Sequence, residues 1–387
     1  MPTASHVLPE GSVLLHIGPA KTGSTAIQHT MFQAREKLAE QGVHYVGTKP
    51  HEKEAGAVAL GVRGPIGRRP ARPEAWQRLV DEIAGATLPR LCLSNEDFGR
   101  ADDEALLRIL DATGAERTHL VYVARRLDKV LPSSWQQQVK ARVTASYPDF
   151  LREVLDPTAT SWTARLVMEP QDVGLVLARW GKHLPQERIT VVVADEGDRT
   201  ALPRAFESLL GLPAGLLEPA GGPANRSMGY AETEAVRRLN RLALDEGWSP
   251  RDYRQIVQRA VVRTLKERDS QGPRVGGIPP EAFDRVAELA DAQVEAIASS
   301  GVHVVGDPER LRVRGQVEPV PLPPDVDSVS LDLLADIVSG VRAGSAHLRR
   351  RSRPEVDVHA QRDNLGGRQL LQLIARRAAL RLGVRRA

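Results

Sequence analysis

A short stretch near the N-terminus combines glycines, hydroxyls and one lysine in a spacing suited to binding phosphate. Residues 13–17 form an apolar run typical of a buried strand, and Gly18 and Pro19 interrupt it. Residues 24–35 then have the composition of a helix whose first side chains can cap it. A strand, a glycine loop and a helix N-terminus together present backbone N–H groups to an anion. The residues predicted to bind phosphate are Lys21, Thr22, Gly23, Ser24 and Thr25.

The loop differs from the common nucleoside-triphosphate loop, which reads Gly-x-x-x-x-Gly-Lys-Ser/Thr. Gly18 and Gly23 have the required separation, but Ser24 stands where the lysine belongs, and Lys21 lies inside the loop. This position weakens an ATPase or GTPase interpretation. The plainer alternative is a tight strand-to-helix turn with an exposed lysine.

A second segment carries an arginine and a hydroxyl in a related setting. Arg125 directly follows the apolar run 118–124, and Ser133 comes eight residues later, inside a predicted helix. A guanidinium and a hydroxyl over a strand-to-helix turn can hold a phosphate together, because arginine binds phosphate through two parallel hydrogen bonds. The doubled residues Arg126 and Ser134 are the alternative pair. Arg125 is also suited to a simple surface ion pair with Asp128.

Together the two segments resemble the sulfotransferases that use 3′-phosphoadenosine 5′-phosphosulfate as donor. Gly-Pro-Ala-Lys-Thr-Gly-Ser-Thr is similar to their 5′-phosphosulfate loop, and Leu-Pro-Ser-x-Trp-Gln from Leu131 resembles bacterial members. The resemblance covers roughly residues 12–310. It implies that Lys21 contacts the phosphosulfate and that Arg125 and Ser133 hold the 3′-phosphate. The family's C-terminal Arg-Lys-Gly is missing, and Arg226 is a candidate substitute cation.

Transfer to a hydroxyl also needs a general base. Glu96 is the first candidate, because it follows the predicted strand 91–94 and ligands bind at the carboxyl ends of strands in α/β sheets. The alternative is that residues 95–97 only cap the helix predicted to begin near Asp103, or stay solvated. His51 is the competing base, whereas His16 lies within the first strand and is expected to be buried.

The surrounding elements indicate how these residues are positioned. Strands alternate with helices up to about residue 194, which predicts an α/β fold with a parallel sheet flanked by helices, of the P-loop type, and the following half is predicted to be helix-rich. We divide the chain into a sulfotransferase domain (1–312), a Pro-rich linker (313–327) and a helical, Arg-rich extension (328–387). The predicted elements include one helix over 24–40, an irregular stretch over 51–73 and a helix over 331–342.

Composition excludes several classes of protein. The 387 residues carry a net charge of +4, but residues 349–387 alone contain eleven arginines against three carboxylates, so the body of the chain is net acidic. This distribution argues against a nucleic-acid partner. The basic end is expected either to pack as a solvated helix, which we favour, or to touch a membrane surface.

Cysteine content and apolar runs bear on location and metal binding. The single cysteine, Cys92, favours a reducing, cytoplasmic location. No apolar run is long enough for a membrane span, and no signal peptide is evident. Metal-ligand spacings are absent from the sequence, and sulfuryl transfer requires no metal.

The sequence therefore predicts a 3′-phosphoadenosine 5′-phosphosulfate-dependent sulfotransferase. Its acceptor is expected to be a hydroxyl on a carbohydrate, a glycolipid or a small natural product. Two alternatives stay open at this point: a nucleotide-dependent kinase with a degenerate loop, and a nucleotide-binding protein without catalytic turnover.

Overall fold

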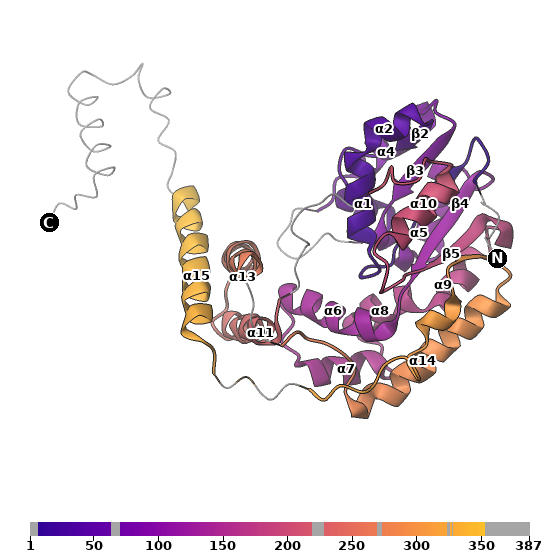
Figure 1. Cartoon of the computed structure of the whole chain (residues 1–387). Helices are drawn as coiled ribbons and strands as arrows, with labels where there is room; N and C mark the ends of the chain where they lie inside the picture. Colours follow the sequence, from indigo (N-terminus) through magenta and orange to yellow (C-terminus); the bar gives the residue numbers. More distant parts are fainter. Residues whose placement is uncertain are drawn as a thin grey trace, which may run out of the picture.

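A six-stranded, entirely parallel sheet forms the centre of the molecule (Figure 1). The computed structural model describes residues 7–62, 70–218, 228–268, 273–322, 326 and 328–352. The strand order is β2-β3-β1-β4-β5-β6. The strands are β1 (Val13–His16), β2 (Val43–Tyr45), β3 (Arg90–Ser94), β4 (Thr118–Ala124), β5 (Ile189–Val193) and β6 (His303–Val305). This arrangement confirms the predicted α/β fold class.

Helices cover both faces of the sheet, which explains why its central strands are apolar runs without alternation. Val13 and Leu15 of β1 face one layer, and Leu14 faces the other. The first layer contains α3 (Lys53–Ala59), α4 (Pro73–Gly85), α5 (Asp103–Thr113), α9 (Val173–Trp180) and part of α14 (Pro280–Ser299). The second layer contains α1 (Ser24–Gln33), α2 (Arg35–Glu40) and α10 (Ala201–Leu210).

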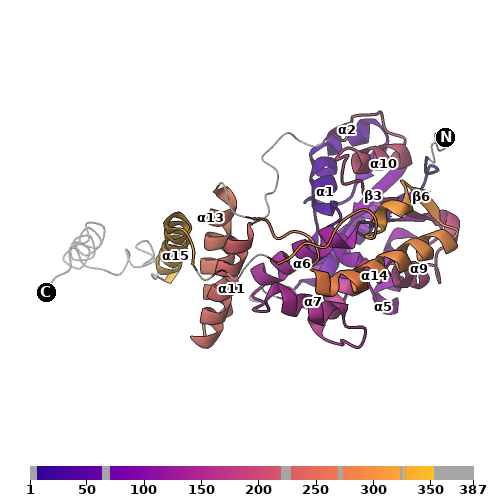
Figure 2. The ribbon, with the colours of Figure 1, turned by 60° about the horizontal axis from the view of Figure 1, so that its bottom comes forward.

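A third apolar cluster joins the helices that lie beyond the sheet. Trp135 is fully buried at its centre, with its ring 5.3 Å from that of Tyr147 and 6.0 Å from that of Tyr230. The helices are α6 (Leu127–Lys140), α7 (Tyr147–Leu155), α8 (Trp162–Met168), α11 (Tyr230–Asp245), α12 (Pro250–Tyr253), the π-helical η4 (Arg254–Val261), α13 (Val262–Glu267) and α15 (Leu331–Ser352). Both views place α11, α13 and α15 together, away from α9 and α14 (Figures 1 and 2).

Several predicted elements need correction. The helix expected over 24–40 is interrupted at Ala34, and the stretch 51–73, expected to be irregular, contains α3 and the start of α4. Strand β6 was not predicted. The helix expected over 331–342 continues to Ser352 and packs closely on η4: a Cβ at Gly344 would lie 2.6 Å from Cα of Ile256. The division into domain, linker and extension remains a prediction.

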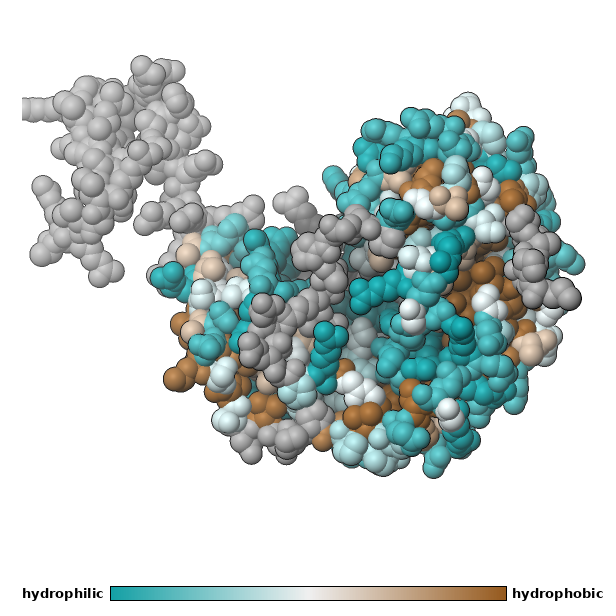
Figure 3. Space-filling view, in the orientation of Figure 1, coloured by the Kyte–Doolittle hydropathy of each residue, from teal (hydrophilic) through white to brown (hydrophobic). Residues whose placement is uncertain are grey.

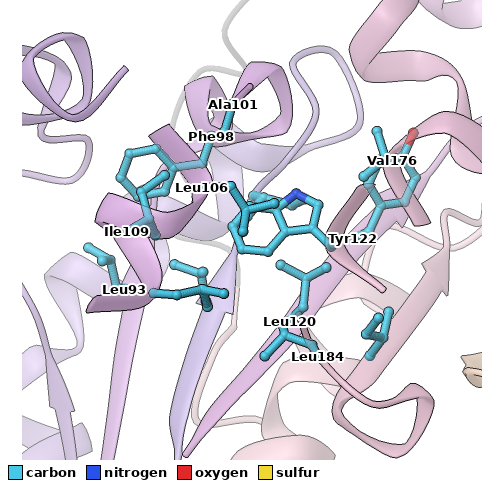
Figure 4. Packing of buried hydrophobic residues seen from close by; sticks show 14 of the residues in the cluster. Leu93, Phe98, Ala101, Leu106, Ile109, Leu120, Tyr122, Val176 and Leu184 are labelled. Atoms are coloured by element: carbon cyan, nitrogen blue, oxygen red, sulfur yellow. The ribbon is translucent and has the colours of Figure 1, made fainter. Parts of the chain in front are cut away.

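Buried packing fixes the segment that follows β3. This segment is the 3₁₀ helix η1 (Glu96–Arg100); the other short 3₁₀ helices are η2 (Glu169–Gln171), η3 (Gln186–Arg188) and η5 (Pro308–Leu311). Phe98 of η1 is fully buried and meets Trp76 edge-on at 6.2 Å. Figure 4 shows Phe98 and Ala101 beside Leu106 and Ile109 of α5. The neighbouring Glu96 is therefore held at a defined place above the sheet.

Candidate active site

The three predicted motifs lie at one edge of the sheet, because β1 pairs with both β3 and β4 in parallel. Gly18 follows β1, Glu96 follows β3 and Arg125 follows β4. The carboxyl ends of parallel strands are where open α/β sheets bind ligands. Figure 3 shows hydrophilic side chains gathered on this face between the α1 side of the sheet and the helices beyond it.

The backbone of the loop after β1 turns sharply before α1 begins. Gly18, Lys21 and Gly23 have φ angles of +85°, +73° and +102°. Such angles are easy for glycine and unusual for lysine, so the surrounding structure must hold Lys21 in place. Gly18 is required for a second reason, since a Cβ there would lie 2.8 Å from Cβ of Glu96. The loop and the predicted base are thus in direct contact.

The carbonyl groups of the loop are taken up by hydrogen bonds. Pro19 O accepts from the hydroxyls of Thr22 at 2.7 Å and Ser24 at 2.8 Å. Ala20 O accepts from Nε2 of Gln171 at 2.9 Å, and Gln171 O in turn accepts from Nε2 of Gln293 on α14. Lys21 O accepts from Arg125 at 2.7 Å. These bonds stabilise the unusual backbone conformation of the loop.

Unlike the loop carbonyls, the N–H groups at the start of α1 make no hydrogen bonds to the described residues. Gly23 is the N-cap and has no side chain to cap the helix. Among the described residues, no hydrogen bond uses the N–H groups of Gly23, Ser24 and Thr25. The Thr22 and Ser24 hydroxyls are buried and serve Pro19, whereas Thr25 is exposed. Three N–H groups without a partner among the described residues, together with the positive end of a helix dipole, are suited to binding an anion.

Lys21 reaches from this loop across to α6. Its Nζ donates to Oε1 of Gln137 at 3.3 Å. Burial lowers the pKa of Lys21, the Glu96 carboxylate opposes this shift, and the charges of Lys266, Lys53 and Arg125 add to it. The ammonium group is thus hydrogen-bonded to α6 and attracted by the Glu96 carboxylate.

The two candidate bases belong to one cluster. His51 Nδ1 lies 3.9 Å from Oε1 of Glu96, and its Nε2 lies 2.9 Å from Oδ1 of Asn95 and 3.3 Å from Oδ2 of Asp97. Although burial acts against it, hydrogen bonding from His51 and the charge of Arg100 keep the pKa of Asp97 below its usual value. Asn95 also caps η1 by accepting from the Asp97 N–H. Helix α5 is capped by Asp102, whose side chain accepts from the Ala105 N–H, so the alternative that residues 95–97 cap the helix beginning at Asp103 is wrong.

His16 lies beneath the site, inside the sheet, as expected. It is fully buried, its Nδ1 lies 2.7 Å from Oγ of Ser94, and its ring meets Phe206 edge-on. Burial, with a contribution from His51, lowers the pKa of His16 to about 3. His16 therefore stays neutral at physiological pH.

Arg125 makes an ion pair that the sequence did not indicate. Its Nε and Nη2 donate to the two carboxylate oxygens of Glu196 at 2.6 and 2.8 Å. The expected partner, Asp128, is instead held by Arg126 at 2.6 Å and 3.1 Å. Asp128 is nearly fully buried, so Arg126 is committed to a structural pair. Of the two arginines, Arg125 is the one at the loop.

Ser133 lies on the face of α6 that the loop meets. It precedes Gln137 by four residues, which places both on one side of the helix. Ser133 is partly buried, and no described residue hydrogen-bonds its hydroxyl. Ser134 is buried on a neighbouring face. Arg226 lies outside the described residues.

Sequence reasoning missed Glu196, Gln171 and Gln137. Glu196 follows β5 closely, so its place at a strand end was a usable signal. Gln137 was detectable from its four-residue spacing to Ser133. Nothing in the local sequence of Gln171 indicates its contact with Ala20.

Metal-ligating clusters and membrane-spanning helices are both absent from the described parts of the chain. There, no group of three or more histidine, cysteine or acidic side chains is arranged to hold a metal ion. None of the helices described is both long and apolar enough to cross a membrane.

Comparison with solved structures finds distant similarity of fold. No family model and no curated protein matches the sequence. Among solved structures, a sulfotransferase from Alicyclobacillus acidocaldarius aligns with a TM-score of 0.39 and 14% identity, covering 60% of this chain and 95% of that chain. At this distance the likeness carries no functional conclusion, which must come from the site itself.

Proposed function

We propose that the protein is a sulfotransferase that takes a sulfuryl group from 3′-phosphoadenosine 5′-phosphosulfate and transfers it to an acceptor hydroxyl. The observation that carries this proposal is the loop after β1. Among the described residues, no group accepts from the N–H groups of Gly23, Ser24 and Thr25. Lys21 of the same loop donates to Gln137, and the charge of Glu96 acts on it. An anion with a transferable charged group fits this arrangement.

The donor is assigned to residues of the loop and of α6. The N–H groups of Gly23, Ser24 and Thr25 bind the 5′-phosphate, with the exposed Thr25 hydroxyl as a further donor. Arg125 and Ser133 bind the 3′-phosphate. Arg125 must then exchange the Glu196 carboxylate for the phosphate, which is a favourable exchange because a phosphate offers the same two-oxygen geometry with more negative charge.

The transfer step places the acceptor hydroxyl between Glu96 and Lys21. Glu96 takes the hydroxyl proton as the oxygen forms a bond to sulfur, and the bond from sulfur to the bridging phosphate oxygen breaks. Negative charge develops on that bridging oxygen, and Lys21 neutralises it. His51 supports Glu96 through the cluster around Asn95. The step resembles phosphoryl transfer in depending on positioning and charge neutralisation.

The proposal is tested by calorimetric titration with 3′-phosphoadenosine 5′-phosphate, 5′-AMP and ATP with magnesium. We expect the 3′-phosphorylated nucleotide to bind most tightly. Arg125→Ala should weaken its binding about 100-fold, since a two-oxygen pair with phosphate is lost, and should leave 5′-AMP binding nearly unchanged. Arg204→Ala is the matched control, because Arg204 is an exposed arginine paired with Asp198 in the loop after β5.

Two outcomes would overturn the proposal. Preference for ATP with magnesium would favour the kinase alternative. Equal affinity for 5′-AMP and the 3′-phosphorylated nucleotide would remove the role of Arg125. Tight donor binding without sulfuryl transfer to any hydroxyl acceptor, whether carbohydrate, glycolipid or small natural product, would instead support a nucleotide-binding protein.

A further inference from the structure

The face of α6 that meets the loop continues to a second lysine. Ser133, Gln137 and Lys140 are separated by four and three residues, so they follow one side of the helix. The hydrogen bond from Lys21 to Gln137 places this side against the loop. Lys140 is the last residue of α6, about 10 Å along the helix axis from Ser133.

Positive charge converges at this end of α6. Gln258 Nε2 donates to the Lys140 carbonyl at 2.8 Å, which fixes η4 against the last turn of α6. The charges of Lys21 and Lys266 both act on Lys140, and Lys266 also acts on Lys21. The loop, α6 and α13 thus direct one lysine each toward the same region.

Lys140 contrasts with another lysine of the same helix. Lys129 pairs with Asp128 at 3.2 Å and is 41% exposed. Lys140 is partly buried, and no described carboxylate lies within ion-pair distance of it. Burial and its two lysine neighbours lower the pKa of Lys140 to about 7. Holding a charged amine there is unfavourable, and a bound anion would relieve the cost.

We propose that Lys140 binds an anionic group of the acceptor, so that the substrate of this enzyme is an acidic molecule bearing a carboxylate, sulfate or phosphate as well as the reacting hydroxyl. This inference rests on the proposed function, because it assigns the Lys140 end of α6 to the acceptor. Arg125 precedes α6, Lys21 contacts Gln137 in its last turn, and Lys140 is its last residue. A molecule held at Lys140 can therefore present a hydroxyl to Lys21 and Glu96 from the side opposite the 3′-phosphate.

Inorganic sulfate is the probe, titrated calorimetrically into protein saturated with 3′-phosphoadenosine 5′-phosphate. With the donor site filled, we expect wild type to bind one sulfate and Lys140→Met to bind it at least tenfold more weakly. Lys129→Met is the matched control and should behave as wild type. Equal sulfate affinity in Lys140→Met, or no sulfate bound by the loaded wild type, would overturn the proposal.

Nucleotide affinity is measured first on each variant, which separates the two proposals. Lys140→Met should bind 3′-phosphoadenosine 5′-phosphate as wild type does. If this variant loses nucleotide and sulfate affinity equally, Lys140 belongs to the donor site and the acceptor assignment is wrong. If wild type fails to bind the nucleotide, the proposed function is wrong. In that case, loss of sulfate binding in unloaded Lys140→Met, with retention in Lys129→Met, still identifies the anion site.

Discussion

The loop after β1 and the side chain of Arg125 differ in whether their hydrogen-bond donors already have partners. In the loop from Gly18 to Thr25, the carbonyls of Pro19, Ala20 and Lys21 accept hydrogen bonds, whereas no described residue accepts from the N–H groups at the start of α1. At the end of β4, Arg125 is already held by both carboxylate oxygens of Glu196. One part is ready for an anion, and the other must first give up a partner.

This difference indicates that the loop is preorganised for binding an anion, whereas Arg125 discriminates between ligands. A preorganised loop binds any phosphate of the right size without further rearrangement, which favours affinity. A guanidinium that already has a carboxylate releases it only to a ligand that offers a better arrangement of charge. We infer that the loop supplies general phosphate binding and that the Arg125–Glu196 pair discriminates for the 3′-phosphate.

The largest expected effect on nucleotide affinity comes from a substitution that distorts the loop after β1. Gly18→Ala introduces a Cβ 2.8 Å from Cβ of Glu96 at a φ of +85°, so it displaces both the loop and the base. Strain and overpacking of about 2–4 kcal/mol should weaken binding of 3′-phosphoadenosine 5′-phosphate at least tenfold. Isothermal calorimetry measures the change.

Gly11→Ala is the control for this variant. Gly11 has the same φ of +85°, but a Cβ there would contact nothing within 4 Å. We expect the Gly11→Ala variant to lose some stability and to keep the nucleotide affinity of wild type. If both variants bind nucleotide equally well, the loop does not depend on its contact with Glu96.

The second largest effect is expected from removing the carboxylate that pairs with Arg125. Glu196→Gln removes the charge that holds Arg125 and that repels an anionic nucleotide. We expect 3′-phosphoadenosine 5′-phosphate to bind about three- to tenfold more tightly, with little change for 5′-AMP. Asp198→Asn, which alters the Arg204 pair in the same loop, should have no effect. Weaker binding in Glu196→Gln would show that Glu196 positions Arg125 rather than competing for it.

Lys140 extends the comparison, since it is a cation without a described carboxylate partner. Folding lowers the pKa of Lys140 from its usual value to about 7, through burial and the charges of Lys21 and Lys266. Between pH 7 and about 10, the unfolded chain therefore holds more protons on this side chain than the folded protein does. The free energy of unfolding of wild type should rise across this window relative to Lys140→Met, by on the order of 1 kcal/mol or more.

Urea unfolding of both proteins at a series of pH values measures this difference. Lys129→Met is again the control, because Lys129 is exposed and paired with Asp128. A constant difference between wild type and Lys140→Met over the whole window would mean that Lys140 is not perturbed.

The smallest effect is expected from one hydroxyl inside the loop. Ser24→Ala removes one of two hydrogen bonds to Pro19 O, and Thr22 keeps the other. The loss should be about 1 kcal/mol of stability, with nucleotide affinity reduced no more than a few-fold. Thermal unfolding and calorimetry report the two quantities. A large loss of nucleotide affinity at unchanged stability would instead give the Ser24 hydroxyl a direct role in binding phosphate.

The sequence predicted the sheet well because strongly apolar runs such as residues 118–124 leave few alternatives. Strand β6 was not predicted because it has only three residues, which are partly buried at the sheet edge and form no long apolar run. Helix α3 escaped because glycine and proline around it suggested a loop, whereas Ala55 and Ala59 pack on the sheet. In both cases tertiary packing outweighed local preference.

The candidate site was predictable where it depends on strand ends. Lys21, Glu96 and Arg125 follow three neighbouring strands, so their proximity follows from the parallel sheet. The residues that hydrogen-bond to Arg125 and to the loop carbonyls lie in other segments of the chain. Glu196 follows the end of β5, so its proximity to Arg125 was also predictable, but nothing in the local sequence of Gln171 indicates its hydrogen bond to Ala20.

The hydrogen bonds from Gln293 to Gln171 and from Gln171 to Ala20 have a consequence for biosynthesis. The loop after β1 is synthesised well before α14, which anchors its support. A nascent chain that has only its first strands can form the glycine turn without the brace that secures Ala20. The loop is therefore expected to reach its final conformation late in folding, after α14 has been synthesised and has docked.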